Sequence, residues 1–481
     1  MKRNNINSNF QKKRTDENQT PENPDEADTM EYEDPTIDEY ENEETHDAMD
    51  EDATGIDIEK EDKNEQDEKP NAVFRVGKDS LVEGEELDYD SSAYIMYHAL
   101  NVEWPCLSFD VVNDNLGLER SRFPMTLFAV GGTQAENEND NKLVVMKMFD
   151  MYKTKFDEDP EEDDDGEGLD TDAQIMYQCI NHKGAINRVR CMPDSSQIVA
   201  TWSEKGSIDI YDVTNQLTIL NGGNSLRNPN QGAIYSYSHS TEGYAMDWNR
   251  KNKGLLATGD NNGNIYLHTY SQSGWSTNKR PFTCGNGRSI EDIQWSTDED
   301  NVFATCSSDR YIRIWDTRSA TYEPVLSVLA HDDDVNVISW NKLVGYLMVS
   351  GSDDNSFKVW DLRAFKNENC VYMYNNNYAG ITSVEWSPSE SSVLAVTTDS
   401  QMTLWDLSLE SDSVENQQDI QGLEDLPQQL LFEHGQEDIK EVHFHSQIPG
   451  CLVTTALSGF NVVIPDVYTE EQSEDENEMI E

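Results

Sequence analysis

Residues 331–361 read HDDDVNVISWNKLVGYLMVSGSDDNSFKVWD and contain all the elements of a repeat that recurs along this 481-residue chain. The stretch ends in Trp360-Asp361, and the same pair occurs 45 residues earlier, at Trp315-Asp316, and 45 residues later, at Trp405-Asp406. A second tryptophan series marks an earlier strand of successive units, at Trp248, Trp295, Trp340 and Trp386. This period is the one expected for the four-stranded blades of a WD-repeat β-propeller.

Six units can be aligned in this way, and a seventh is implied. The second series extends to the segments Ile186-Asn-Arg-Val-Arg-Cys191 and Ile439-Lys-Glu-Val-His-Phe444, and Tyr211-Asp212 is a variant of the Trp-Asp pair. The seventh unit consists of the strand-rich stretch 105–150 and the strand 174–180. We therefore predict an all-β fold, a seven-bladed WD-repeat propeller that hides its strand edges by closing into a ring.

The quoted stretch also contains the residue types of a buried hydrogen-bonded chain. In a WD blade Asp354 accepts a hydrogen bond from His331, while Ser350 bridges to the indole N–H of Trp360. Because a buried polar chain is favourable only when every member is paired, losing one member should cost about 1–3 kcal/mol. We assign the same role to the matching residues of the neighbouring units: Asp309, Trp315, Asp399 and Trp405. Two units lack the full set and are interpreted as degenerate blades, those around Leu267-His268 and Ser458-Gly459.

The chain carries a formal net charge of −59, from 94 acidic and 35 basic residues. Three segments hold most of it: residues 16–70 with 25 acids and 3 lysines, residues 157–172 with 11 acids and no base, and residues 466–481 with 8 acids and no base. A compact domain resists such a charge because like charges repel each other. We therefore expect a disordered acidic N-terminal region over 1–80, a propeller over 88–465 with an acidic insertion at 155–172, and an acidic tail at 466–481.

The composition excludes several classes of function. Direct binding to nucleic acid requires Lys and Arg, which are scarce here, and no apolar run reaches the length of a membrane span. The seven cysteines include no Cys-x-x-Cys pair, which favours reduced thiols inside the cell. The N-terminus lacks the apolar core of a secretory signal. Lys2-Arg3 with Lys12-Lys13-Arg14 is interpreted as a two-part nuclear import signal or as a solvated basic end.

We predict a binding protein without a cofactor, not an enzyme. The chain has no phosphate-binding Gly-Lys loop, no Gly-x-Ser-x-Gly elbow and no His-Glu-x-x-His motif. His443 and His445 would lie on the same face of a strand, but no third metal ligand is near them in sequence. We therefore expect these histidines to have a structural role and predict no metal site.

Eight segments outside the Trp-Asp pairs carry a more specific signal. They are Glu83-Gly-Glu-Glu-Leu87, Pro105-Cys-Leu-Ser-Phe-Asp110, Gly132-Thr-Gln-Ala-Glu136, Gly184-Ala-Ile-Asn-Arg-Val-Arg190, Trp202-Ser-Glu-Lys-Gly206, Asp334-Val-Asn-Val-Ile-Ser-Trp340, Asp425-Leu-Pro-Gln-Gln-Leu-Leu-Phe432 and Thr455-Ala-Leu-Ser-Gly-Phe460. In these segments the sequence resembles the glutamate-rich WD-repeat proteins, which are ribosome-assembly chaperones. The resemblance covers about residues 80–465, and the acidic insertion lies where the family has one. It implies a nuclear or nucleolar chaperone of a newly made basic protein of the large ribosomal subunit, the third of the large-subunit series, with histone binding as a secondary activity.

That family is similar in turn to the retinoblastoma-binding histone chaperones. The similarity rests on Tyr97-His-Ala-Leu100 with Glu103-Trp-Pro105, and on Gly422-Leu-Glu-Asp425 with Pro427 and Leu430-Leu-Phe432. In those chaperones an acidic loop and a long N-terminal helix clamp a helix of the histone. Here Pro70 and Gly77 interrupt the segment before Asp88, so we expect no long helix there.

Three acidic sites are candidates for binding a basic partner. The first is the insertion, with Asp157, Glu158, Asp159, Glu161, Glu162, Asp163, Asp164 and Asp165, which is either an anionic tether or a solubilising loop. The second is the loop in which Glu424 and Asp425 face the partner and Leu431 and Phe432 belong both to an apolar edge and to the first strand of the last blade. The third is Asp332, Asp333 and Asp334 between two blades, which either adds to an anionic face or forms a polar turn.

Two further segments keep a third class of function open. Trp315-Asp-Thr-Arg318 and Trp360-Asp-Leu-Arg363 fit the Trp-Asp-x-Arg pattern of substrate receptors of cullin ubiquitin ligases, although arginine after a blade strand is common in WD repeats. We predict a monomeric chaperone that shields a basic large-subunit ribosomal protein in the nucleus and nucleolus, with shuttling to the cytoplasm left open. The alternatives are a histone-binding chaperone and a ligase substrate receptor.

Overall fold

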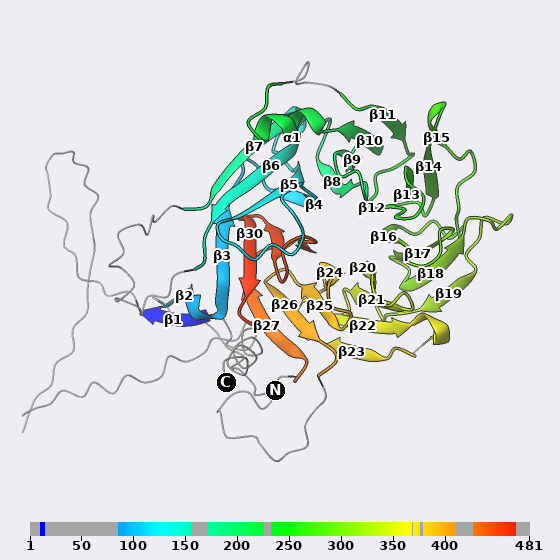
Figure 1. Cartoon of the computed structure of the whole chain (residues 1–481). Helices are drawn as coiled ribbons and strands as arrows, with labels where there is room; N and C mark the ends of the chain where they lie inside the picture. The colour runs from blue at the N-terminus through cyan, green and yellow to red at the C-terminus, as the bar shows by residue number, and fades with distance from the viewer. Residues whose placement is uncertain are drawn as a thin grey trace, which may run out of the picture.

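The computed structural model describes residues 10–14, 85–154, 172–225, 232–367, 369–375, 379–409 and 427–467. Their strands form seven four-stranded antiparallel sheets that stand side by side in a closed ring around a central axis (Figure 1). The prediction of an all-β, seven-bladed propeller is therefore confirmed.

Each sheet is one blade, and the first four blades use strands that are consecutive along the chain. The first contains β4 (Cys106–Val112), β5 (Met125–Thr133), β6 (Lys142–Met151) and β7 (Gln174–Asn181). The second contains β8 (Ile186–Cys191), β9 (Ile198–Ser203), β10 (Ser207–Asp212) and β11 (Tyr235–Ser238). The third contains β12 (Ala245–Trp248), β13 (Leu255–Gly259), β14 (Ile265–Ser271) and β15 (Gly274–Thr277). The fourth contains β16 (Ile290–Trp295), β17 (Val302–Ser307), β18 (Tyr311–Asp316) and β19 (Leu326–Leu329).

The remaining three blades complete the ring. The fifth contains β20 (Val335–Trp340), β21 (Leu347–Ser352), β22 (Ser356–Asp361) and β23 (Tyr372–Asn375). The sixth contains β24 (Ser383–Trp386), β25 (Val393–Thr397), β26 (Gln401–Asp406) and β27 (Leu430–Gly435). The seventh contains β28 (Glu441–Phe444), β29 (Leu452–Ala456), β30 (Gly459–Pro465) and β3 (Tyr94–Leu100).

The outermost strand of the seventh blade comes from the beginning of the propeller instead of its end. β3 pairs antiparallel with β30, with Tyr94 opposite Pro465 and Leu100 opposite Phe460. In the other six blades the chain runs from the innermost strand to the outermost one. The chain thus ties its two ends together in one sheet, so that the ring cannot open without breaking main-chain hydrogen bonds.

This order corrects one prediction. We expected Leu430, Leu431 and Phe432 in the first strand of the last blade, but they belong to β27, the outermost strand of the sixth blade. The physical reason is the inner-to-outer order of the chain, because the strand after each long loop completes the preceding sheet.

Neighbouring blades are joined close to the axis by acidic side chains of the innermost strands. A carboxylate of one blade accepts a hydrogen bond from a backbone N–H of the next: Asp110 from Cys191 (2.7 Å), Asp247 from Trp295 (2.8 Å), Asp292 from Ile338 (3.2 Å), Glu385 from Phe444 (3.0 Å) and Glu441 from Phe109 (2.9 Å). Burial raises the pKa of Asp247 to about 6. The repetition of this link around the ring fixes the innermost strands relative to one another.

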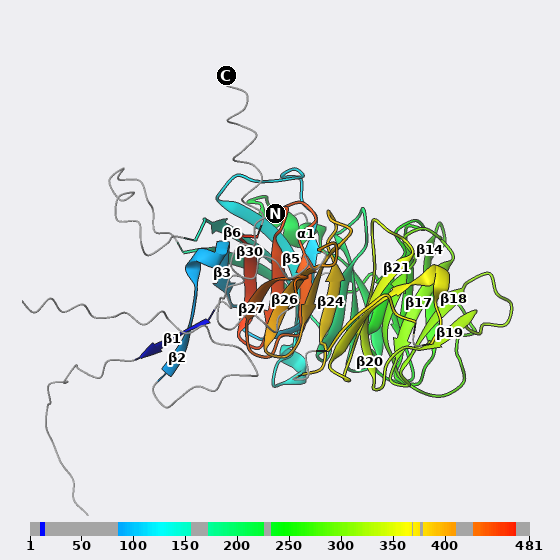
Figure 2. The ribbon, with the colours of Figure 1, turned by 90° about the horizontal axis from the view of Figure 1, so that it is seen from below.

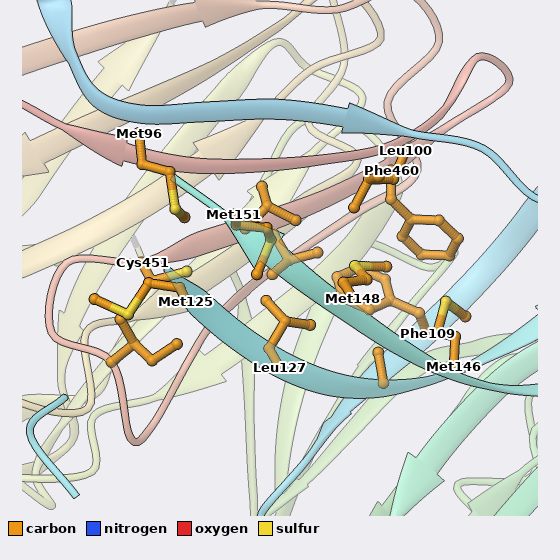
Figure 3. Packing of buried hydrophobic residues seen from close by; sticks show 14 of the residues in the cluster. Met96, Leu100, Phe109, Met125, Leu127, Met146, Met148, Met151, Cys451 and Phe460 are labelled. Carbon is orange, nitrogen blue, oxygen red and sulfur yellow. The ribbon is translucent and has the colours of Figure 1, made fainter. Parts of the chain in front are cut away.

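The junction between the first and the seventh blade is filled with flexible apolar side chains. It contains several methionines, including Met96, Met125, Met146 and Met148, which pack around Phe109 (Figure 3). Methionine adapts its shape to irregular gaps. This property suits the one junction at which a strand from far along the sequence must fit against the blade that follows it.

A short two-stranded sheet lies beside β3, outside the ring (Figures 1 and 2). It consists of β1 (Phe10–Arg14) and β2 (Glu85–Tyr89), and the 3-10 helix η1 (Ser91–Ala93) connects β2 to β3. Residues 85–93 therefore form a strand and one short turn of helix, as expected from the interrupted sequence before β3.

Two further observations complete the description. Within the described ranges, no helix has the length and apolar character needed to cross a bilayer, and the α-helix that they contain, α1 (Thr214–Leu220), has seven residues. All seven cysteines are free thiols, and Cys106, Cys306 and Cys451 are buried in the blades.

Candidate protein-binding site

The four residues predicted to form a buried chain lie together in the fifth blade. The indole N–H of Trp360 donates to Ser350 Oγ (2.9 Å), and Ser350 Oγ lies 2.7 Å from His331 Nε2. His331 Nδ1 in turn donates to Asp354 (2.9 Å). Burial lowers the pKa of His331, so that the ring is neutral and its Nε2 accepts the hydrogen of Ser350. Partial burial alone would raise the pKa of Asp354, but hydrogen bonds from His331 and Ser356 outweigh it and lower that pKa.

The neighbouring blades use the equivalent tryptophans differently. The indole of Trp315 donates to Thr305 (2.9 Å), and Asp309 is bound by Arg313 instead of a histidine (2.9 Å). In the sixth blade the indole of Trp405 donates to Thr403, two residues earlier in the same strand (2.9 Å). Asp399 of that blade is exposed, and among the described residues its carboxylate has no hydrogen-bond partner.

The two units that we interpreted as degenerate blades are complete four-stranded sheets, and both contain buried polar networks of their own. In the third blade Thr258 lies 2.9 Å from His239 Nε2 and 2.9 Å from His268 Nε2. In the seventh blade Thr454 donates to Gln436 (2.6 Å), and His434 lies between Tyr94 and Asn461 (2.8 and 2.9 Å). Other polar residues thus replace the usual ones in these blades.

Three aspartates lie on the face of the ring at which the innermost strands begin. Asp332 and Asp333 are exposed and Asp334 is half-buried, directly before β20. Burial raises the pKa of Asp334, and repulsion from Asp333 and Asp353 raises it further, although Arg288 opposes this effect. The raised pKa indicates that this face holds more negative charge than it can neutralise with its own cations.

The acidic cluster continues toward the axis. Glu291 occupies the second position of β16, and burial raises its pKa, as does repulsion from Asp334 and Asp353. Arg188 counteracts part of this charge, and its Nε donates to the carbonyl oxygen of Tyr244 (2.9 Å). Tyr244 itself is 37% exposed. The opening of the ring on this face therefore offers carboxylates and an aromatic surface. We call Glu291, Asp332, Asp333, Asp334 and Asp353 the acidic face.

A network of buried charges lies below the acidic face, and the sequence reasoning missed it. Glu441 of β28 forms ion pairs with Arg188 and with Arg190 (3.0 Å), both from β8 on the far side of the first blade. Ser108 also donates to Glu441 (2.8 Å). Burial alone would raise the pKa of Glu441, but the two arginines outweigh it and hold the pKa well below its usual range. A signal was present in the sequence, because Arg188, Arg190 and Glu441 occupy the inner-strand segments that extend the tryptophan series.

His443 belongs to the same network, whereas His445 does not. His443 Nδ1 donates to Glu385 (3.0 Å), and its Nε2 lies 3.6 Å from Glu441. Burial opposes a charge on this imidazole, but the two carboxylates outweigh burial and raise its pKa to about 9. His445 instead accepts a hydrogen bond from the backbone of Gln447 (3.0 Å). Among the described residues no group of three or more His, Cys, Asp or Glu is arranged to hold a metal ion.

The other two candidate sites lie mostly outside the described residues. The eight acids of the insertion between Asp157 and Asp165 are not among them, and neither are Glu424 and Asp425. Phe432 is buried and packs edge-on against Tyr94, with ring centroids 5.2 Å apart, and Leu431 is half-buried beside it. Phe432 is therefore a core residue and is not available to a partner.

The arginines of the two Trp-Asp-x-Arg segments are paired within their own turns. Arg318 binds Asp316 (2.7 Å) and Arg363 binds Asp361 (2.6 Å), and both arginine side chains are exposed. Arg363 also lies over the ring of Tyr346, 3.6 Å from its centroid. This geometry accounts for both arginines by local pairing.

Comparisons with known proteins agree with this architecture. The family model of the histone-binding protein RBBP4 and its counterpart in the CAF1 complex matches residues 84–151, and the model "WD domain, G-beta repeat" matches 278–316, 322–361 and 368–406. Ribosome assembly protein rrb1 of Schizosaccharomyces pombe is 40% identical over 450 residues, which cover 90% of this chain and 92% of the relative. Glutamate-rich WD repeat-containing protein 1 of Dictyostelium discoideum is 44% identical over 416 residues (82% and 85%). Protein HEAT STRESS TOLERANT DWD 1 of Arabidopsis thaliana is 41% identical over 431 residues (82% and 92%).

Proposed function

Because this chain belongs to the family of ribosome assembly protein rrb1 and glutamate-rich WD repeat-containing protein 1, we propose that it acts in the nucleus in ribosome biogenesis, by binding and not by catalysis. More specifically, it is a chaperone that shields a newly made basic protein of the large subunit, the third of the large-subunit series. It releases this client to the nascent subunit.

The observation that carries the proposal is the acidic face. Its carboxylates crowd one another enough to raise the pKa of Asp334 and of Glu291, which means that a cation placed between them would relieve repulsion. A ribosomal protein that must later bind RNA exposes many Lys and Arg side chains. An acidic partner neutralises these side chains and competes with premature contacts to RNA phosphates.

The three acidic segments of the sequence extend the same electrostatic argument. They belong to a chain whose described ion pairs already bind many of its own basic side chains, such as Arg188, Arg190 and Arg313. Exposed charges act over about 8 Å at physiological ionic strength. We therefore expect the segments to speed the capture of the client more than they tighten the final complex.

The test compares two triple substitutions that remove the same charge from opposite faces of the ring. D332N/D333N/D334N alters the acidic face, whereas D298N/E299Q/D300N alters exposed acids just after β16, where the innermost strands end. Association of the purified chain with the free ribosomal protein is measured at two salt concentrations. We expect the first variant to associate about three- to tenfold more slowly and with a weaker salt dependence, because it lacks the steering charges. The second variant should behave like the parent chain.

Equal rates for both variants would remove the acidic face from the mechanism. Failure of the parent chain to bind any free large-subunit protein would refute the proposed function as a whole.

A second candidate function is the binding of histones. The specific observation in its favour is the match of residues 84–151, from β2 to β6, to a histone-binding family model. The same association experiment with core histones in place of the ribosomal protein separates the two functions. Binding to a histone that is at least as tight as binding to the ribosomal protein would favour the second function.

A further inference from the structure

The two-stranded sheet outside the ring brings together segments that are far apart in the sequence. β1 pairs antiparallel with β2, so that Phe10 lies opposite Tyr89, Lys13 opposite Glu86 and Arg14 opposite Glu85. A basic strand, Phe10-Gln-Lys-Lys-Arg14, is therefore seated on an acidic one, Glu85-Glu-Leu-Asp-Tyr89. Opposite charges at paired positions favour this register, and the reverse charges would oppose it.

β2 continues directly into the propeller, whereas β1 is joined to β2 through a long stretch of chain. The ring of Tyr89 packs edge-on against Tyr97 of β3, with centroids 4.8 Å apart. Asp90, which follows β2, accepts a hydrogen bond from the backbone N–H of Ser92 in η1 (3.0 Å). By contrast, residues 15–84 separate β1 from β2. A two-stranded sheet on its own is only marginally stable, so a strand held in this way can be exchanged.

We propose that β2 is the docking strand for an extended basic segment of the client, and that β1 occupies this strand in the empty chaperone. The inference rests on the proposed function, because it assumes a basic client. A client segment that adds to β2 would make main-chain hydrogen bonds along its edge, and its Lys and Arg side chains would replace those of β1. β1 is thus an internal competitor whose effective concentration is set by the chain that tethers it.

The exchange has a consequence for the displaced segment. β1 contains Lys12-Lys13-Arg14, which we interpreted above as half of a nuclear import signal. In the empty chaperone these residues are held in a strand opposite Leu87, Glu86 and Glu85. Loading of the client would release them for recognition, so that the loaded chaperone would be imported in preference to the empty one.

A peptide of the chain itself provides a direct probe. A fluorescent peptide of residues 6–15 is titrated with the full chain and with the variant K12E/K13E/R14E, in which β1 no longer fits β2. We expect the variant to bind the peptide about tenfold more tightly than the parent chain, because its docking strand is free. The matched control is K60E/K63E/K69E, which changes the net charge by the same amount between the two strands and should bind like the parent chain. Equal gains in both variants would show a general charge effect and overturn the proposal.

Two further variants locate the binding site and the client. Adding E85K/E86K to K12E/K13E/R14E should abolish binding of the peptide, whereas adding D298N/E299Q should leave it unchanged. Binding of the ribosomal protein should also tighten in K12E/K13E/R14E, and that protein should displace the peptide. A ribosomal protein that binds equally well with or without β1, while the peptide exchanges as expected, would overturn the role of β2 as a client site and leave the proposed function intact. A ribosomal protein that does not bind at all would refute the proposed function instead.

Hydrogen–deuterium exchange of the full chain gives an independent readout. In the empty chain the amides of β1 and of β2 should both be protected. On addition of the ribosomal protein, β1 should lose its protection and β2 should keep it, because the client takes the place of β1. Joint loss of protection in both strands, or no change in either, would contradict the exchange.

Discussion

The fifth and the third blade solve the same hydrogen-bonding problem with different residues. In the fifth, the buried hydroxyl of Ser350 accepts from the indole N–H of Trp360 and lies between it and an imidazole. In the third, the buried hydroxyl of Thr258 lies between the imidazoles of His239 and His268. The sequence marks the first blade clearly and gives no such sign for the second, although both place one hydroxyl at the centre of a buried chain.

The difference shows that the blade requires complete pairing and tolerates changes of residue type. His268 reaches two partners, because its Nδ1 also lies 2.7 Å from Thr277. An indole has a single N–H and no acceptor, so Trp360 depends on one oxygen. The network with the tryptophan should therefore be the more fragile of the two.

The largest effect is expected for Ser350→Ala. It leaves the N–H of Trp360 and the Nε2 of His331 without a partner in a buried site, so the free energy of unfolding should fall by about 2–3 kcal/mol. Denaturant unfolding monitored by tryptophan fluorescence measures this change. The exposed hydroxyl of Ser319 serves as the control, because Ser319→Ala should change the stability by less than about 0.5 kcal/mol.

A smaller effect is expected for Thr258→Val, which keeps the shape and removes the hydroxyl. His268 retains Thr277, and His239 retains Asp260 at 3.4 Å, so that the free energy of unfolding should fall by about 1–2 kcal/mol. The same unfolding experiment compares this variant with Ser350→Ala. If Thr258→Val proved the more damaging of the two, the argument from the number of partners would be wrong.

The sequence could predict the blades with regular spacing, because tryptophan at a fixed position reflects the packing that every blade repeats. It could not predict β3 as the closing strand, since the pairing of Tyr94 with Pro465 depends on where the ring ends and not on any local pattern. The buried ion pairs of Glu441 were missed for a similar reason. They join β28 to β8 across the first blade, and a single strand does not reveal which neighbour will supply the arginines.

The candidate site was predicted only in part. Asp332 and Asp333 are exposed as the turn-like sequence suggested, but Phe432 is buried because β27 packs under Tyr94. Alternation along a strand indicates two faces without indicating which of them another element covers. The contribution of Glu291 also depends on the closed ring, which brings the starts of all innermost strands to one opening.

Acid should distinguish the third blade from its own variant His268→Gln. Burial lowers the pKa of His268 to about 3 in the folded chain, below the value of about 6.5 expected when it is unfolded. As the pH falls below about 6.5 the unfolded state takes up a proton that the folded state refuses, so stability is lost from there down to about 3. Removal of this imidazole should reduce the loss between pH 6 and 5 by up to about 1 kcal/mol, as measured by denaturation midpoints at each pH. Identical pH profiles of the variant and the parent chain would mean that His268 is protonated when folded.

The smallest effect is expected in the sixth blade, at the residue that corresponds to Asp354. The carboxylate of Asp354 is held by His331 and Ser356, whereas that of Asp399 is exposed and has no hydrogen-bond partner within the part of the chain that the structure describes. Asp399→Asn should therefore change the free energy of unfolding by less than about 0.5 kcal/mol, within the range of ordinary surface substitutions. Unfolding of this variant beside Ser350→Ala provides the comparison. A loss as large as that of Ser350→Ala would mean that the repeated aspartate stabilises the blade through the sequence of its turn, independently of the network that it joins in the fifth blade.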